Sequence, residues 1–131
     1  MKKQVINPWE WQNDFGFVQA NDISGAQRML LCSGQVSVDE NGAPVHAGDM
    51  SAQIAQALDN LETVLGQAGL ALSDVVRIKC YTTDISATLE SWGVLAGRLG
   101  EGGSQTALTL IGVAALFHPD ILVEIEATVV R

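Results

Sequence analysis

Two glutamates, Glu124 and Glu126, are the side chains best placed to do chemistry. They lie in the apolar segment 121–130, which is typical of a β-strand. Because successive side chains of a strand point to opposite faces, both carboxylates lie on one face. A half-buried glutamate takes a raised pKa and can act as an acid or a base. The alternative is that this face of the strand is simply exposed to water.

A second candidate is the pair Ser33-Gly34, which follows the apolar segment 28–33. Gly34 lacks a Cβ and lets the backbone approach a ligand closely, although the pair also suits a plain strand end. His46 and His118 are the only histidines, and no CxxC or HxxxH spacing occurs, so no metal site is predicted. No phosphate-binding glycine loop or nucleophile elbow occurs, and no cofactor is expected.

The elements that must position these residues can be read from hydrophobic periodicity. A helix begins near Asp49, a good N-cap, and ends before Gly69. A second helix runs from about Asp84 to Gly100 with the same apolar spacing. Five segments read as strands: 15–20, 28–33 (with 36–38 as a continuation), 75–83, 106–115 and 121–130.

The order of these elements is β-β-α-β-α-β-β, which predicts an α/β fold. Its simplest architecture is one mixed sheet with two helices packed on one face. The 131 residues suit one domain, 1–131, in which residues 1–14 form an irregular N-terminal arm.

Composition argues against several classes of function. The net charge is −8, so a nucleic acid or an anionic membrane surface is disfavoured as a partner. No run is long enough to span a membrane and no export signal follows Met1, which predicts a cytoplasmic protein. Cys32 and Cys80 lie in apolar segments, which is typical of buried, reduced cysteines.

Four segments together resemble the Rid (reactive intermediate deaminase) family, also called YjgF-like or L-PSP endoribonuclease-like. Leu-Cys-Ser-Gly-Gln at 31–35 resembles the family's strand-end signature. The other three segments are 48–61, 72–84 and 112–127. They occur in the family's order and spacing, and the resemblance covers about residues 17–130.

The resemblance implies a chorismate-mutase-like fold and a homotrimer with small-molecule pockets between the subunits. In deaminating members an arginine holds the carboxylate of an imino or enamino acid. A glutamate and a backbone carbonyl position the attacking water, and a 2-keto acid and ammonia are released. That glutamate falls on Glu124, and Ser33 and Gly34 match the family signature.

This chain departs from the family pattern where the substrate is bound. The arginine position falls on Leu108, and no arginine or lysine occurs anywhere from residue 99 to 130. The position two residues later, often Cys or Thr, falls on Leu110. The family's tyrosine falls on Phe17 and its asparagine on Glu90. An apolar, acidic pocket of this kind favours a neutral or cationic ligand over a carboxylate.

Three functions therefore compete. The first is a homotrimer that binds a small metabolite between its subunits without 2-imino acid deaminase activity. The second is an enamine or imine deaminase that uses Glu124 and a displaced cation such as Arg28, Arg77 or Lys79. The third, an endoribonuclease or translation inhibitor, is opposed by the acidic charge. A trimer that acts by binding another protein is a further alternative, and the sequence leaves open whether the chain is an enzyme.

Overall fold

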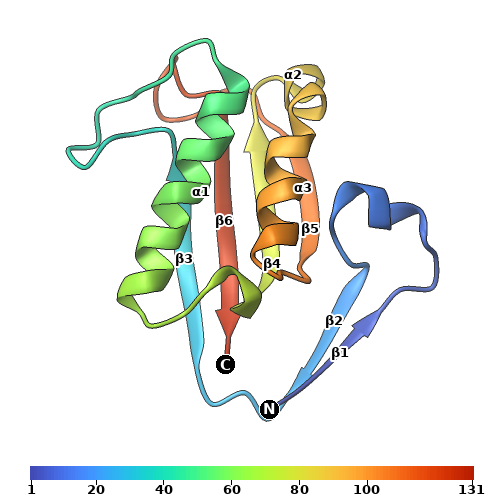
Figure 1. Cartoon of the computed structure of the whole chain (residues 1–131). Helices are drawn as coiled ribbons and strands as arrows, with labels where there is room; N and C mark the ends of the chain where they lie inside the picture. Colours follow the sequence, from blue (N-terminus) through green and yellow to red (C-terminus); the bar gives the residue numbers. More distant parts are fainter.

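A four-stranded mixed sheet forms the centre of the fold (Figure 1). Its strands lie in the order β3 (Met29–Val36), β6 (Val123–Val130), β4 (Val75–Thr82) and β5 (Ala107–Gly112). The β4–β5 pair is parallel and the other two pairs are antiparallel. This computed structural model describes all residues from 1 to 131.

Three helices cover one face of the sheet (Figure 1): α1 (Met50–Gln67), α2 (Ile85–Glu90) and α3 (Trp92–Glu101). The side chains of Asp49 and Asp84 cap α1 and α2, as the sequence predicted. The single helix expected from Asp84 to Gly100 is in fact two helices that meet at Ser91. The backbone of Ser91 lies outside the helical region. The Ser91 hydroxyl oxygen is 2.7 Å from the hydroxyl oxygen of Ser51 on α1. The mixed sheet with helices on one face confirms the expected α/β architecture.

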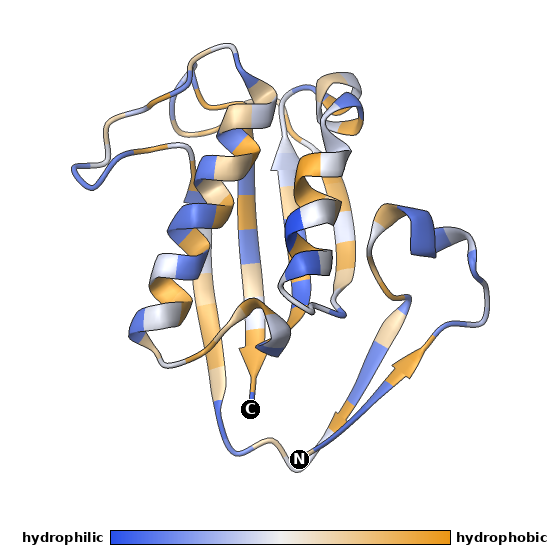
Figure 2. Ribbon diagram, viewed as in Figure 1, coloured by the Kyte–Doolittle hydropathy of each residue, from blue (hydrophilic) through white to orange (hydrophobic).

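The core lies between the helices and the sheet, where buried apolar side chains form one cluster. Figure 2 shows that the helices and strands on either side of it carry many hydrophobic residues. Alternation along β6 places Ile125 in this core and Glu124 and Glu126 on the opposite, open face of the sheet. Cys32 and Cys80 are both buried in the core as free thiols. Burial raises the pKa of the Cys80 thiol to about 12.

The N-terminal segment differs from what the sequence predicted. Residues 1–14 were expected to be irregular, but Lys2–Ile6 forms strand β1, which pairs with β2 (Ala20–Ser24) in a separate two-stranded sheet. The strand expected at 15–20 was wrong, because Trp11–Phe15 forms a 3-10 turn that ends at Gly16 with a φ of 78°. Only glycine adopts this backbone conformation at little cost.

Two further strands are shorter than the sequence predicted. The strand expected at 106–115 ends at Gly112, after which the Val113 amide donates to the Thr82 carbonyl. The last strand begins at Val123 because Ile121 still belongs to the preceding turn, where its amide bonds to the His118 carbonyl. No helix in the fold combines the length and the apolar character that crossing a membrane requires.

Candidate functional site

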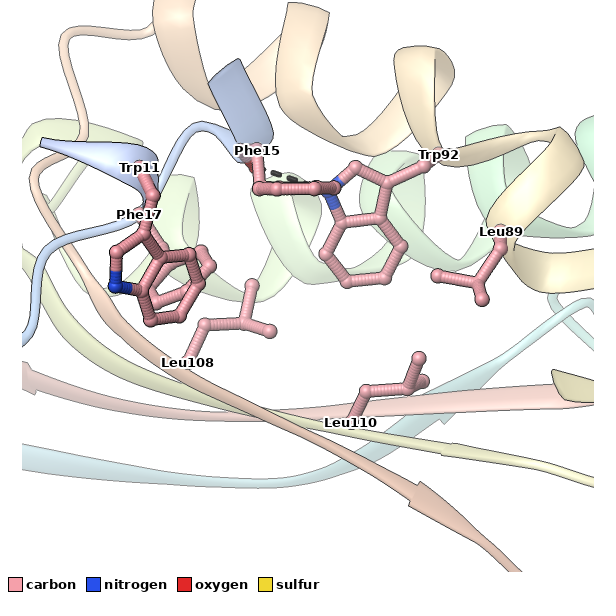
Figure 3. Close-up of a pocket in the computed structure, with 7 residues that line it drawn as sticks. All are labelled: Trp11, Phe15, Phe17, Leu89, Trp92, Leu108 and Leu110. Atoms are coloured by element: carbon pink, nitrogen blue, oxygen red, sulfur yellow. Dashed lines mark hydrogen bonds between the residues drawn. The ribbon is translucent and has the colours of Figure 1, made fainter. Parts of the chain in front are cut away.

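Seven apolar side chains line a pocket between the N-terminal segment, the α2–α3 pair and β5, here called the aromatic pocket (Figure 3). Its cavity volume is about 200 Å³. Its residues are Trp11, Phe15, Phe17, Leu89, Trp92, Leu108 and Leu110. Three of the seven come from the N-terminal segment, so this segment forms one wall of the pocket.

Hydrogen bonds and close packing hold that wall in place. The Trp92 indole N–H donates to the Phe15 carbonyl at 2.9 Å, as the dashed line in Figure 3 shows. Gly16 lies tightly against Ala96 of α3, where an added Cβ would come within 3.1 Å of the alanine Cβ. The Val18 amide donates to the Thr106 carbonyl at 2.9 Å, which ties the segment to the start of β5.

The rings of the wall meet edge to face. Trp11 and Phe17 have centroids 5.8 Å apart with planes at 75°, and Trp11 and Phe15 are 6.4 Å apart at 71°. Both arrangements are favourable for aromatic pairs. Trp92 is buried, whereas Trp11, Phe15 and Leu89 are exposed. We infer that Trp92 lies on the inner side of the pocket and that the exposed three form its rim.

A second pocket, here called the carboxylate pocket, lies on the open face of the sheet. Its volume is about 290 Å³. Its residues are Gly34, Tyr81, Val113, Leu116, Glu124 and Glu126. The Tyr81 hydroxyl donates a hydrogen bond to Glu126, whereas the side chain of Glu124 makes no hydrogen bond within the chain.

Glu124 lies against the backbone of Gly34. A Cβ built on Gly34 would come within 1.8 Å of Glu124 Oε1, so no other residue leaves this carboxyl group where it is. The close approach occurs where the pairing of β3 with β6 shifts register, between Cys32 and Gln35. An irregularity of this kind bends a strand and re-aims a side chain. Gly34 therefore provides the space that the Glu124 side chain fills.

Two electrostatic effects act in the carboxylate pocket. Desolvation by burial raises the pKa of Glu124 above its ordinary range, and the nearby charge of Glu126 raises it further. The hydrogen bond to Glu126 raises the pKa of Tyr81, and desolvation and the charges of both glutamates add to this. Glu124 thus keeps its proton to a higher pH than an exposed glutamate, which suits an acid or a base.

The two pockets lie on opposite faces of the sheet within one chain. Leu108 and Leu110 pair with Ile78 and Cys80 of β4, whose side chains are in the core beneath the helices. Glu124, in contrast, pairs with Tyr81 on the open face. Because cross-strand partners share a face, no ligand bound within one copy of the sheet contacts both pockets directly.

The structure groups the predicted site residues in two sets. Phe17, Leu108 and Leu110 line the aromatic pocket, and Gly34 and Glu124 line the carboxylate pocket. Ser33 on β3 and Glu90 at the end of α2 are both exposed and line neither.

Sequence reasoning missed four residues of the aromatic pocket and one important residue of the carboxylate pocket. Trp92 and Leu89 lie in the expected second helix, with the spacing of an ordinary apolar stripe. Trp11 lies in the expected irregular arm, and Phe15 in the strand expected at 15–20. The missed residue of the carboxylate pocket is Tyr81, whose place on the open face of β4 was readable from strand alternation. No group of three or more His, Cys, Asp or Glu residues is arranged to hold a metal ion.

Known proteins resemble this chain over most of its length. The family model described as endoribonuclease L-PSP matches residues 15–131. A RutC family protein from Pyrococcus horikoshii is 32% identical over 102 residues, which cover 78% of this chain and 79% of the relative. The 2-iminobutanoate/2-iminopropanoate deaminase of Escherichia coli is 31% identical over 121 residues, covering 88% of this chain and 87% of the enzyme.

A solved structure also matches the whole chain. It is the crystal structure of YyfB from Yersinia pestis, a Rid family protein of unknown function, which is 38% identical. The match covers 100% of both chains with a TM-score of 0.89. This agreement in sequence and in fold leads to one conclusion: the chain belongs to the endoribonuclease L-PSP family, the group of Rid and YjgF-like proteins with a chorismate-mutase-like α/β fold.

Proposed function

We propose that this protein is a cytoplasmic homotrimer that binds a small uncharged or cationic metabolite between its subunits, without 2-imino acid deaminase activity. The observation that carries the proposal is the surroundings of Leu108. This residue falls at the family's arginine position, and every residue that lines the pocket around it is apolar. A carboxylate there has no charged partner, and an unpaired desolvated charge costs several kcal/mol.

One feature supports the trimer. The open face of the sheet exposes Met29 and Leu31 of β3, with 64% and 72% of their surfaces in contact with water in a single chain. Large apolar side chains grouped on a sheet face are typical of an interface. In such an assembly, neighbouring copies could supply the aromatic pocket and the carboxylate pocket to one ligand, which a single chain cannot do. Light scattering on the eluting protein measures this assembly directly, and a monomer would contradict it.

A coupled assay tests the missing deaminase activity. An amino-acid oxidase generates 2-imino acids in situ, and semicarbazide traps those that are not hydrolysed. We expect the purified protein to leave the trapping rate unchanged, while the Escherichia coli relative named as a deaminase lowers it. Faster hydrolysis by this protein that is lost in Glu124→Ala would contradict the proposal, because the chemistry would then proceed without the arginine.

One observation favours a second function, hydrolysis of an imine that has no carboxylate. The Glu124 side chain is partly desolvated, has no hydrogen-bond partner in the chain and keeps its proton to a higher pH than usual. Such a group can protonate the imine nitrogen while water adds to the carbon. The resulting carbinolamine loses ammonia as its C–N bond breaks, which leaves an aldehyde or ketone. Amine-derived imines supplied by an amine oxidase test this function in the same trapping assay, with Glu124→Gln as the control.

A further inference from the structure

The aromatic pocket has the size and the lining of a site for one aromatic ring. Its volume is about 200 Å³, and all seven lining residues are apolar. An engineered apolar cavity of about 150 Å³ in another protein stays free of water and binds benzene. A single ring therefore matches the volume of the aromatic pocket, which differs from that cavity in being open to water at its rim.

The pocket offers a buried ligand no hydrogen bond from a side chain. The only polar side-chain atoms among the lining residues are the two indole N–H groups. That of Trp92 already donates to the Phe15 carbonyl, and Trp11 lies at the exposed rim. A polar group placed inside would lose its water without gaining a side-chain partner. The lining therefore favours a hydrocarbon for the buried part of the ligand, and its four aromatic residues favour an aryl group.

The rim indicates the charge of the part that stays outside. Three exposed acidic residues adjoin rim residues in the sequence: Glu10 precedes Trp11, Asp14 precedes Phe15 and Glu90 follows Leu89. No lysine or arginine adjoins any of the seven lining residues. An ammonium group held near this rim is attracted by the ring faces and by a chain whose net charge is −8, whereas a carboxylate is repelled.

We propose that the aromatic pocket takes the ring of an arylalkylamine, with its ammonium group in water at the exposed rim. This inference rests on the proposed function, because it names the class of ligand that the pocket of a non-deaminating member binds. The uncharged alcohol of the same shape is the second-best ligand, and the carboxylate of the same shape is the poorest.

A matched series of probes tests the ligand class on the full-length protein. The probes are 2-phenylethylamine, 2-phenylethanol, phenylacetate and n-propylamine, which vary the charge and the ring separately. Calorimetry measures the binding, and tryptophan fluorescence follows the pocket because two of the three tryptophans line it. We expect the amine to bind at least about tenfold more tightly than phenylacetate, about 1.4 kcal/mol, and n-propylamine not to bind. Phenylacetate binding as tightly as the amine, equal binding of n-propylamine, or no binding of any aryl probe would each overturn the inference.

Two tryptophans of nearly equal exposure provide a matched pair of variants. Trp9 and Trp11 have exposed fractions of 58% and 57%, but only Trp11 lines the pocket. Trp11→Ala is expected to weaken 2-phenylethylamine at least about fivefold, which is a typical effect of removing one stacking or cation–π partner. Trp9→Ala is expected to leave it unchanged. Equal effects of the two variants would place the probe elsewhere and overturn the inference.

A variant that introduces a positive charge inside the pocket completes the test. Leu108→Arg places a cation among the apolar residues and is expected to reverse the order, so that phenylacetate binds more tightly than the amine. If this variant does not fold, the Trp9 and Trp11 pair still decides the matter. The imino acid assay remains a separate measurement, so the protein can fail to bind aryl probes while the proposed lack of deaminase activity stands.

Discussion

The aromatic pocket and the carboxylate pocket are built in opposite ways. The aromatic pocket joins segments far apart in the chain and contains no ionisable side chain. The carboxylate pocket is formed mainly by strands of one sheet and contains two glutamates and the only tyrosine. The lining of one pocket is therefore suited to apolar contact, and the other holds the groups that can move a proton. The apolar surface and the ionisable groups are thus on separate faces of one small chain.

The largest expected effect concerns the structural basis of the aromatic pocket. Trp92 is 8% exposed and packs in the core, so Trp92→Ala is expected to lower the free energy of unfolding by about 3–5 kcal/mol. Trp92→Phe keeps a ring but removes the donor to the Phe15 carbonyl, and is expected to cost less. Urea unfolding measures both. A loss below about 1 kcal/mol for Trp92→Ala would mean that the pocket is separate from the core.

An intermediate effect on stability is expected where the Glu124 side chain packs against the backbone of Gly34. Gly34→Ala forces the glutamate side chain aside, since the new Cβ would lie within 1.8 Å of Oε1 and 2.5 Å of Cδ. We expect a loss of about 1–3 kcal/mol in urea unfolding, which is typical of overpacking. The loss should be much smaller when the same change is made in a Glu124→Ala chain, because the clash is then gone. Equal losses in the two backgrounds would show that the close approach has no energetic consequence.

A smaller effect is expected in the pH dependence of stability. The pKa of Glu124 is raised in the folded chain, so between the ordinary glutamate value of 4.5 and that raised pKa the folded state holds a proton that the unfolded state has released. Stability is therefore lost as the pH rises through this window. Glu124→Gln removes this loss, so the Tm of the variant relative to the natural chain should increase with pH. Glu40→Gln, in the exposed turn after β3, is the control and should show no such trend.

The smallest effect concerns a single phenol. Tyr81 is the only tyrosine, so ultraviolet absorbance follows its titration without interference from another phenol. Its pKa lies above the ordinary value of 10.0, chiefly because its hydroxyl donates to Glu126. Glu126→Gln should bring the midpoint down, since the amide carries no negative charge to oppose the phenolate. An unchanged midpoint would mean that the pair is not formed in solution.

The carboxylate pocket was largely readable from the sequence. A period of two in the segment 121–130 placed Glu124 and Glu126 on one face, and the same rule applied to β4 places Tyr81 beside them. The helix that begins after Asp49, the aspartate caps of α1 and α2, and the strands β3, β4, β5 and β6 were predicted from the same kind of local pattern. These features depend on local patterns, because within a strand or helix the side-chain direction of one residue determines that of its neighbours.

The aromatic pocket was not readable in the same way. Its defining contact joins Phe15 and Trp92, which are 77 residues apart, and no local pattern encodes that pairing. The apolar alternation near residues 15–20 was mistaken for a strand, because Phe15 and Phe17 face the pocket from an irregular turn. Buried Gln12 holds that turn through a bond from its side-chain amide to the Trp9 carbonyl at 2.8 Å. Tertiary contacts of this kind override local preference.

Because both thiols are buried, their rate of chemical labelling measures how often this fold opens. Burial raises the pKa of Cys80 to about 12, so its thiol is protonated at neutral pH, and its sulfur has almost no contact with water. A thiol reagent is therefore expected to modify Cys80 only when the sheet opens, so that the labelling rate reports how often that happens. Cys32 lies on the far side of β6 from Cys80, since β6 separates β3 from β4. A disulfide between Cys32 and Cys80 can therefore form only after the chain unfolds.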